Sequence, residues 1–214
     1  DTRLPREPMG SAFSAGLRYV AMSPNLMRVI LRGFWFGLSA IALLALLPVV
    51  VRDTLNATAF IYGVMLGCFG MGAVAGALAN SRLRARFANE YIARGGFTGF
   101  AISCVVLAIS GQILVSGIAL MLAGACWVLS LSMFNVTIQL SAPRWVVGRV
   151  IALYQTGTFG GMAAGSLIWG VIADRIGPET ALLGASVLLV VGALLGVRLP
   201  LPEFGGLDLD PLNR

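Results

Sequence analysis

The sequence predicts an all-α membrane protein, a bundle of six transmembrane helices. Of its 214 residues, 58% are hydrophobic and 11% are charged, whereas charged residues make up roughly 25% of a typical soluble domain. Six apolar segments each reach the length of about 20 residues that a helix needs to cross the hydrocarbon core. These segments lack the strict polar-apolar alternation of transmembrane strands, which favours helices.

The first part of the chain, 1–27, is expected to be a cytoplasmic linker that contains one amphipathic helix. Phe13, Leu17 and Val20 recur at helical spacing, and Arg18 lies off that apolar stripe. This pattern is typical of a short helix that lies on a membrane surface. A Ser-Pro pair follows and is expected to end it.

The six apolar segments are predicted to occupy 28–198 and to cross the membrane in turn. Their expected bounds are 28–51, 59–80, 91–110, 113–141, 150–173 and 179–198. The second and fifth segments are the richest in glycine, which allows helix backbones to approach closely in lipid. The tail, 199–214, contains several Pro and Asp residues and is expected to be disordered. Because the chain starts at Asp1 and shows no signal peptide, we expect a fragment of a longer protein.

The arginines predict how the helices are oriented. All 15 basic residues are arginine, and the net charge is +6. If the N-terminus lies in the cytoplasm, all but Arg52 and Arg175 fall on or near the cytoplasmic side, as the positive-inside rule requires. An even number of spans then returns the C-terminus to the same side. The arginines form no continuous patch, so they indicate membrane topology and not a nucleic-acid partner.

The composition also argues against an enzyme. The sequence contains no His, which excludes His-based catalysis and His-ligated metals. Cys68, Cys104 and Cys126 all lie inside apolar segments, without the spacing of a metal site or an extracellular disulfide, and are interpreted as packing residues. We therefore expect no catalytic residue, no metal and no cofactor.

A weak internal repeat links the second and fifth segments. The stretch 67–70 reads Gly-Cys-Phe-Gly, and 157–160 reads Gly-Thr-Phe-Gly, at an offset of 90 residues. Each stretch lies in the middle segment of a group of three. This is the pattern of a 3+3 inverted repeat, which is common in secondary transporters.

Three stretches resemble the major facilitator superfamily (MFS), and within it the transmembrane secretion effectors that include enterobactin-type exporters. The first is a Gly-Arg pair four residues before Leu-Tyr, the second is a Gly-x-x-x-Asp-Arg-x-Gly motif, and the third leads into the first span. They comprise Gly148-Arg149 with Leu153-Tyr154, then Gly170 to Gly177, and Gly16-Leu17-Arg18-Tyr19-Val20 with Ser23-Pro24.

The resemblance covers nearly the whole chain and implies half of an MFS fold, helices seven to twelve. It implies a secondary active exporter of small amphipathic molecules, of drug or siderophore type, that works by alternating access in a bacterial inner membrane. The implied partners are the N-terminal six-helix half, the lipid bilayer, a small-molecule substrate and the proton as coupling ion. The alternative function is a non-transporting membrane assembly module.

One family motif is altered after the second segment. Asn80 stands where the family has an acidic residue, and three arginines follow at Arg82, Arg84 and Arg86. In the family this loop makes charge contacts that gate the transporter. The other interpretation is that these arginines obey only the positive-inside rule.

Four further charged residues are candidates for gating. Arg149 opens the fifth segment and is expected to reach an acid such as Glu90 at the same membrane face, or else to extend towards lipid headgroups. Asp174 and Arg175 at the outer end of that segment are interpreted as a simple neighbour pair or as part of an outer gate.

Uncharged residues inside the spans are the candidates for substrate binding. Every acid in the spans lies near a segment end, so the group that carries a coupled proton is expected in the other half. Aromatic rings and a few hydrogen-bonding groups suit a large amphipathic substrate, although each residue has helix packing as its alternative role. The candidates are Phe36, Ser39, Trp127, Ser130, Phe134, Asn135, Tyr154 and Gln155.

Overall fold

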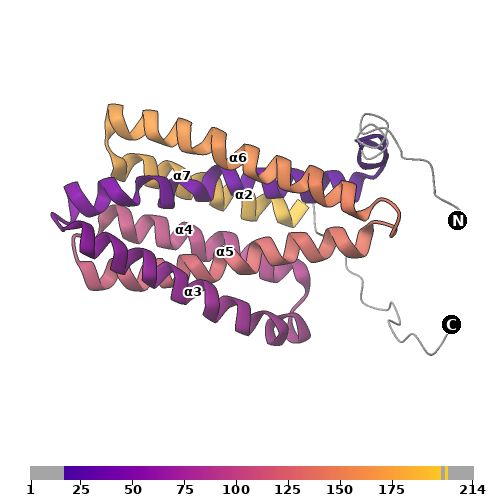
Figure 1. Cartoon of the computed structure of the whole chain (residues 1–214), viewed down its shortest axis with the longest axis horizontal. Coiled ribbons are helices and arrows are strands. Elements are labelled where there is room, and N and C mark those ends of the chain that lie inside the picture. Colours follow the sequence, from indigo (N-terminus) through magenta and orange to yellow (C-terminus); the bar gives the residue numbers. More distant parts are fainter. Residues whose placement is uncertain (1–16, 199–200, 202–214) are drawn as a thin grey trace, which may run out of the picture.

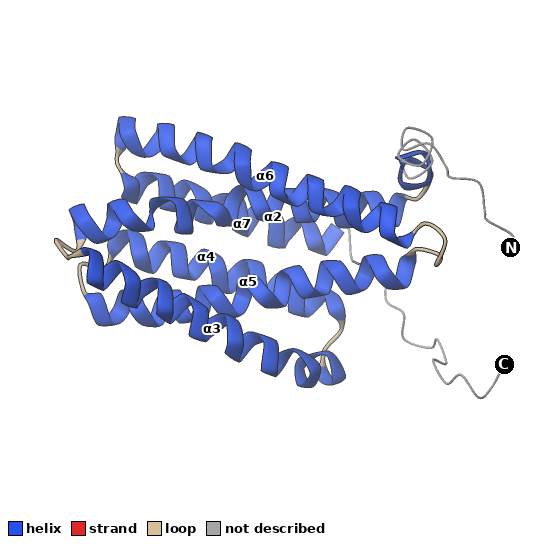
Figure 2. Ribbon diagram, viewed as in Figure 1, coloured by secondary structure: helices blue, strands red, loops and turns tan. Residues whose placement is uncertain are grey.

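The computed structural model describes residues 17–198 and Leu201, and this part contains six long helices and no strand (Figures 1 and 2). Each of the six is long and apolar enough to cross a membrane, which confirms the predicted all-α membrane bundle. The elements are α2 (Pro24–Val49), η1 (Val50–Thr54, a π-helical continuation of α2), α3 (Ala59–Arg86), α4 (Asn89–Ile109), α5 (Ile113–Ser141), α6 (Val147–Ile176) and α7 (Pro178–Arg198).

The predicted bounds agree with these helices to within a few residues at most ends. The largest difference is in α3, which continues past the predicted end at Asn80 to Arg86. No Gly or Pro interrupts this stretch, and Arg and Leu are good helix formers, so the helix extends beyond the apolar segment.

The amphipathic helix is seen in part. Residues 17–22 are helical, with Val20 buried and Leu17 exposed. The ring of Tyr19 packs edge-on against Trp145 in the α5–α6 loop, with centroids 5.7 Å apart. Phe13 and nearly all of the predicted tail lie outside the described residues.

Consecutive helices run antiparallel, and three pairs make the most extensive contacts, although α4 packs on α5 almost as extensively as on α7. Helix α2 packs lengthwise on α6, α3 on α5, and α4 on α7 (Figure 1). The triplets α2–α4 and α5–α7 each contain three helices, so the second triplet starts from the opposite end of the bundle. If α2, α3 and α4 correspond to α5, α6 and α7, then the α2–α6 pair corresponds to the α5–α3 pair. The α4–α7 pair corresponds to itself.

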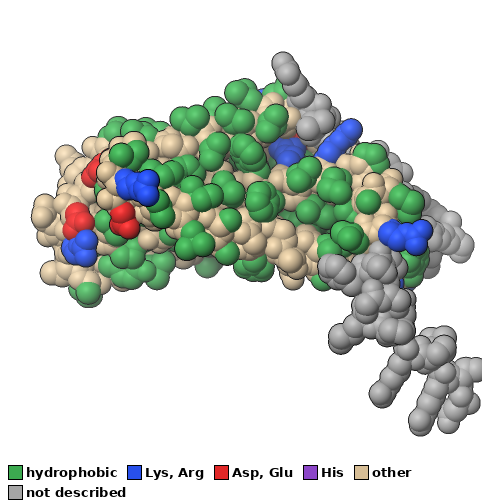
Figure 3. Space-filling model, turned by 90° about the horizontal axis from the view of Figure 1, so that it is seen from above, with side chains coloured by type: hydrophobic (Ala, Val, Ile, Leu, Met, Phe, Trp, Pro, Cys, Tyr) green, Lys and Arg blue, Asp and Glu red, His purple; other side chains and the backbone are tan. Residues whose placement is uncertain are grey.

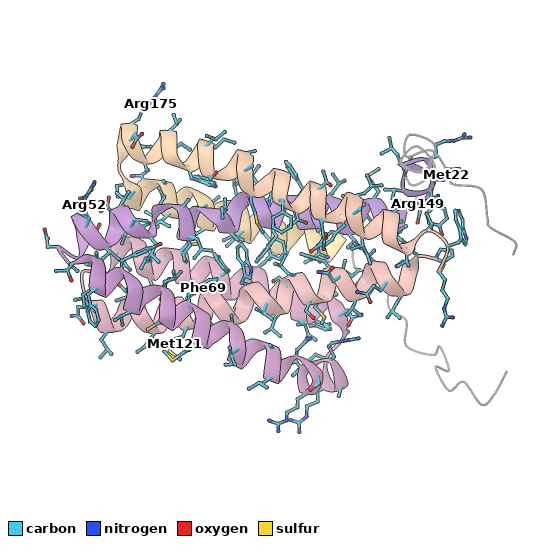
Figure 4. The ribbon with its side chains drawn as sticks, viewed as in Figure 1. Met22, Arg52, Phe69, Met121, Arg149 and Arg175 are labelled. Atoms are coloured by element: carbon cyan, nitrogen blue, oxygen red, sulfur yellow. The ribbon has the colours of Figure 1, made fainter. Side chains whose placement is uncertain are left out.

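Two glycines make the α3–α5 crossing close. A Cβ atom added to Gly72 would overlap the carbonyl oxygen of Met121, and one added to Gly124 would overlap that of Phe69. Figure 4 shows Phe69 and Met121 on these two helices. Each helix therefore presents a glycine to the backbone of the other, and a larger residue would force the helices apart.

The α2–α6 crossing repeats this arrangement. A Cβ on Gly161 would lie 2.5 Å from the carbonyl oxygen of Phe34, and one on Gly37 would lie 2.5 Å from that of Thr158. In both crossings, each glycine follows the contacted carbonyl of its own helix by three residues. The two crossings are thus equivalent at the level of single residues.

A third contact extends the equivalence and fixes its register. Gly76 approaches the carbonyl of Ala125, and Gly165 approaches that of Leu38. The glycines of α3 and α6 therefore correspond at an offset of 89 residues, and the predicted offset of 90 is wrong. Most glycines of the predicted internal repeat, such as Gly70 and Gly160, have no atom within 4 Å of an added Cβ.

Exposed hydrophobic side chains lie along the middle of the bundle on the face that Figure 3 shows. In Figure 3, hydrophobic side chains cover the central part of the visible face, and the charged side chains lie towards the two ends. One end carries both acidic and basic side chains and the other carries basic ones. The chain is therefore a multi-pass membrane protein.

Candidate functional site

A buried ion pair joins α2 to α4 near the end of the bundle where α3 ends and α6 begins. This end is called the arginine-rich end below. Arg32 Nη1 donates to Glu90 Oε2 at 2.6 Å, and Nη2 donates to Oε1 at 3.1 Å. Arg32 is 7% exposed and Glu90 is 8% exposed. The backbone N–H of Leu201 also donates to Glu90 Oε2, at 2.9 Å. This fork-shaped, charge-assisted pairing is among the stronger polar contacts in proteins.

The neighbours of the pair explain its position. Gly196 of α7 lies directly against Glu90 Oε1, and a Cβ there would come within 2.7 Å of Arg32 Nη2. The guanidinium carbon of Arg32 lies 5.9 Å from the centre of the Phe97 ring, within the range of a cation–π contact. Glycine thus makes space for the pair and an aromatic ring covers it.

This pair corrects one of the expectations from the sequence. The sequence predicts that Arg149 reaches Glu90, but in the structure the Glu90 carboxylate accepts hydrogen bonds from Arg32 and from the backbone N–H of Leu201. Glu90 does lie at a helix end, as the second residue of α4, yet it is buried by α2 and α7. The sequence contained one indication of this partner, which is Arg32 itself. It lies inside an apolar run, one helical turn after Arg28.

Two tryptophans that the sequence did not single out link α2 to its neighbours. Trp35 Nε1 donates to the carbonyl of Leu188 in α7 at 2.8 Å. Trp169 Nε1 of α6 donates to the carbonyl of Leu38 in α2, also at 2.8 Å. These bonds satisfy indole donors that are otherwise costly to bury.

Aromatic rings fill the centre of the bundle. Phe36 is fully buried, and its centroid lies 5.0 Å from that of Phe97, 5.9 Å from Trp127 and 6.4 Å from Phe134. Most of these contacts are edge-to-face, the geometry that aromatic pairs favour. In the conformation described, Phe36 and Phe134 therefore form core contacts and expose no surface.

The two candidate serines are also enclosed. Ser39 Oγ donates to the carbonyl of Trp35 on its own helix at 2.9 Å. Ser130 lies against Gly96 of α4, and its Oγ is buried without a hydrogen-bond partner. A buried hydroxyl without a partner is uncommon and costly, so Ser130 is the more notable of the two.

The remaining candidates lie nearer the surface, apart from Tyr154. Trp127 and Asn135 of α5 are half-buried, and Asn135 donates to the carbonyl of Leu131 at 2.9 Å. On α6, Tyr154 is buried against Gly33 of α2, whereas Gln155 is exposed. The structure therefore divides the predicted set into core residues and partly exposed ones, and their contact with a substrate stays a prediction.

The charged gating candidates lie at the two ends of the bundle. Arg82, Arg84 and Arg86 are exposed on the last turns of α3. Figure 4 places Arg149 at one end of the bundle, and Arg52 and Arg175 at the other. This distribution agrees with the arginine asymmetry of the sequence.

Asn80, in the altered motif, has a structural role. Its Nδ2 donates to Ser132 Oγ at 2.8 Å and so joins α3 to α5. At the other end, Asp174 and Arg175 are exposed and form no ion pair with the described residues. Thr54 and Glu179 are hydrogen-bonded there at 2.9 Å. In the described part, no three Cys, Asp or Glu side chains come together to hold a metal.

Comparison with known proteins gives one family. A family model described as transmembrane secretion effector matches residues 1–214, the full length of the chain. No curated protein matches the chain.

Proposed function

The chain belongs to the transmembrane secretion effectors, a family of MFS-type membrane transporters, and we propose that it forms the C-terminal half of a secondary active exporter. The observation that carries this proposal is the pair of equivalent glycine crossings, α3 on α5 and α6 on α2. Two inverted triplets of helices build each six-helix half of an MFS transporter. The proposed cargo is a small amphipathic molecule of drug or siderophore type.

The exposed faces of α3 and α6 support a second, N-terminal half as partner. Helix α3 buries only Met65, Gly72 and Gly76. On its other faces Gly67 and Gly70 meet nothing within 4 Å, as does Gly160 of α6. Glycines without a neighbour in this chain suit the close approach of helices from another part of the transporter.

The substrate path is proposed to follow the seam between α2 and α5. Helix α2 contacts α5 far less than it contacts α6, and α5 contacts α2 far less than it contacts α3. The α2–α5 contact is therefore the least extensive of these three helix contacts. Trp127 and Asn135 lie half-buried on α5. The buried Phe36 packs on Trp127 and on the buried Phe134, and the buried Ser130 of α5 lies against Gly96 of α4. Alternating access would expose these groups in turn as the two halves rock.

Topology and coupling follow from the charges. The arginine-rich end is proposed to face the cytoplasm of a bacterial cell, with both termini on that side of the inner membrane. The one buried acid among the described residues, Glu90, is already paired with Arg32. We therefore place the group that carries a coupled proton in the partner half.

Transport by everted membrane vesicles tests the proposal. Vesicles from cells that produce the full-length protein, energised so that their interior is acidic, should accumulate the amphipathic dye ethidium in exchange for protons that leave the lumen, and a protonophore should abolish uptake. Asn135→Ala should reduce the initial rate several-fold, because it removes a polar group from the proposed path. Thr98→Ala is the matched control: Thr98 makes the same bond to a carbonyl of its own helix, at 2.9 Å, but at an exposed position of α4.

The assembly-module alternative predicts a different result. Uptake would be equal in vesicles with and without the protein, for ethidium and for a panel of other amphipathic dyes and siderophores. That outcome would reject the exporter and leave the six-helix bundle without a transport role.

A further inference from the structure

A cavity of about 350 Å³ opens between α2 and α7 at the arginine-rich end. It is separate from the proposed substrate seam, because neither α3, α5 nor α6 contributes a residue to it. The lining residues are Arg28, Leu31, Arg32, Phe34 and Trp35 of α2, Phe97 of α4, and Gly192 and Leu195 of α7.

The polarity of the cavity changes along its length. Arg28 and Arg32 lie at the end nearer the start of α2, and Trp35 lies deeper in the bundle. At a helical rise of 1.5 Å per residue, Arg28 and Trp35 are about 10 Å apart along the axis of α2. The cavity wall itself is apolar, and the half-buried Arg28 lies at its outer end, an order that matches the step from headgroup to acyl chain in one leaflet.

One of the two lining arginines, Arg28, has unused capacity to donate hydrogen bonds. Arg28 is half-buried and pairs with no described acid. Arg32 gives both Nη atoms to Glu90, but its Nε–H is buried without an acceptor. Because that Nε atom is buried, a ligand in the cavity does not reach it, and the donors available to an anion at the mouth are those of Arg28.

The charge balance selects an anion. Among the residues that the structure describes, Glu90 neutralises one of the two lining arginines and no acid pairs with the other, which leaves a net positive charge there. Arg94 lies close by, with its Cγ about 3.2 Å from the position of a Cβ on Gly196. Basic pockets between transmembrane helices are known to hold anionic lipid headgroups.

We propose that this cavity is a binding site for an anionic phospholipid of the adjoining leaflet. Phosphate oxygens accept hydrogen bonds from Arg28. One acyl chain lies along the exposed side chains of Leu31 and Leu195 and ends near Trp35 and Phe97. A soluble phosphate would use Arg28 but leave the apolar wall uncovered, and a neutral lipid would leave the charge unpaired.

Fluorescence quenching of Trp35 tests this site directly. The full-length protein is reconstituted in phosphatidylcholine bilayers and titrated with phosphatidylglycerol that carries bromine atoms on its acyl chains. Quenching should saturate at a lower mole fraction than with brominated phosphatidylcholine, and the saturable component should disappear in Trp35→Phe. Arg28→Gln should weaken the apparent affinity about fivefold, as expected for the loss of one basic residue at a membrane surface.

Matched variants separate the site from general charge or packing effects. Arg82→Gln removes an exposed arginine at the same end of the bundle but outside the cavity, and should leave the titration unchanged. Leu195→Phe narrows the cavity and should lower affinity, whereas Leu167→Phe, on exposed α6, should not.

Three results would each overturn the proposal. Equal titrations with the two brominated lipids would remove the selectivity for an anion. An unchanged affinity in both Arg28→Gln and Leu195→Phe would place the quenching lipid elsewhere. Relief of quenching by millimolar inorganic phosphate would show a site for soluble anions. None of these results depends on whether the protein transports a substrate.

Discussion

At the scale of single residues, the Arg32–Glu90 pair dominates the polar chemistry of the core. Replacing Arg32 by Met leaves a carboxylate buried beside Gly196 without its cation. Loss of one partner of a buried pair is expected to lower the free energy of unfolding by about 3–5 kcal/mol. Equilibrium unfolding in detergent micelles measures this difference.

A double variant distinguishes loss of the pair from poor packing. Arg32→Met with Glu90→Leu replaces both charges by apolar groups and should recover most of the stability. Arg52→Met is the control, since Arg52 pairs with Asp53 on the surface at 2.6 Å, and it should leave the unfolding midpoint unchanged. A double variant as unstable as Arg32→Met would show that the pair is not the source of the effect.

The Ser130→Ala variant tests stability and transport separately, because it removes a single hydroxyl group. Because its buried Oγ has no partner, Ser130→Ala should keep or raise the free energy of unfolding, by up to about 1 kcal/mol. Thr137→Ala on the same helix removes a buried bond to the carbonyl of Met133 at 2.8 Å and should be less stable. If Ser130 contacts substrate in another conformation, Ser130→Ala should also slow ethidium transport; an unchanged rate removes it from the proposed path.

Residue-level chemistry was the part that the sequence predicted least well. Phe36, Trp127 and Phe134 were identified as important aromatic residues, but the sequence did not show that their rings pack on one another. The partner of Glu90 was missed because it depends on α2, α4 and α7 meeting at one point. Such three-helix contacts leave no short-range pattern in a sequence.

At the scale of helices, the glycine crossings are the main packing device. Gly72→Ala should destabilise the bundle by about 1–3 kcal/mol, because the new methyl group overlaps the backbone of Met121. Gly161→Ala at the equivalent crossing should behave alike. The free energy of unfolding in micelles gives both values.

Nearby glycines in open positions are the controls. Gly63 of α3 and Gly95 of α4 are exposed and have nothing within 4 Å, so Gly63→Ala and Gly95→Ala should be neutral or stabilise the helix by about 0.5–1 kcal/mol. Equal effects at Gly63 and Gly72 would contradict the described α3–α5 crossing.

The helices themselves were predictable, whereas their register was not. Apolar length determines each span, so the predicted bounds of α4 and α5 lie within two residues of the observed ones. Glycines occur on several faces of α3 and α6, so the sequence alone did not show which of them, Gly70 or Gly72, faces a neighbour. The repeat was therefore recognised with its offset one residue too long.

At the scale of the whole molecule, the arginine asymmetry predicts the orientation. A cysteine at Arg175, exposed at one end, should react with a membrane-impermeant maleimide in intact spheroplasts. A cysteine at Arg84, exposed at the other end, should react only after permeabilisation. Labelling of both positions in intact spheroplasts, or the reverse pattern, would contradict the proposed topology.

The central claim is that this bundle is one half of a transporter that alternates between two open states. Its most direct test is the alkylation rate of a cysteine at Gln155, exposed on α6, measured in everted vesicles with and without a proton gradient. Alternating access predicts a several-fold change in rate on energisation, whereas a cysteine at Thr98 on α4 should react at a constant rate. A Gln155→Cys rate that is the same in both conditions would contradict the claim.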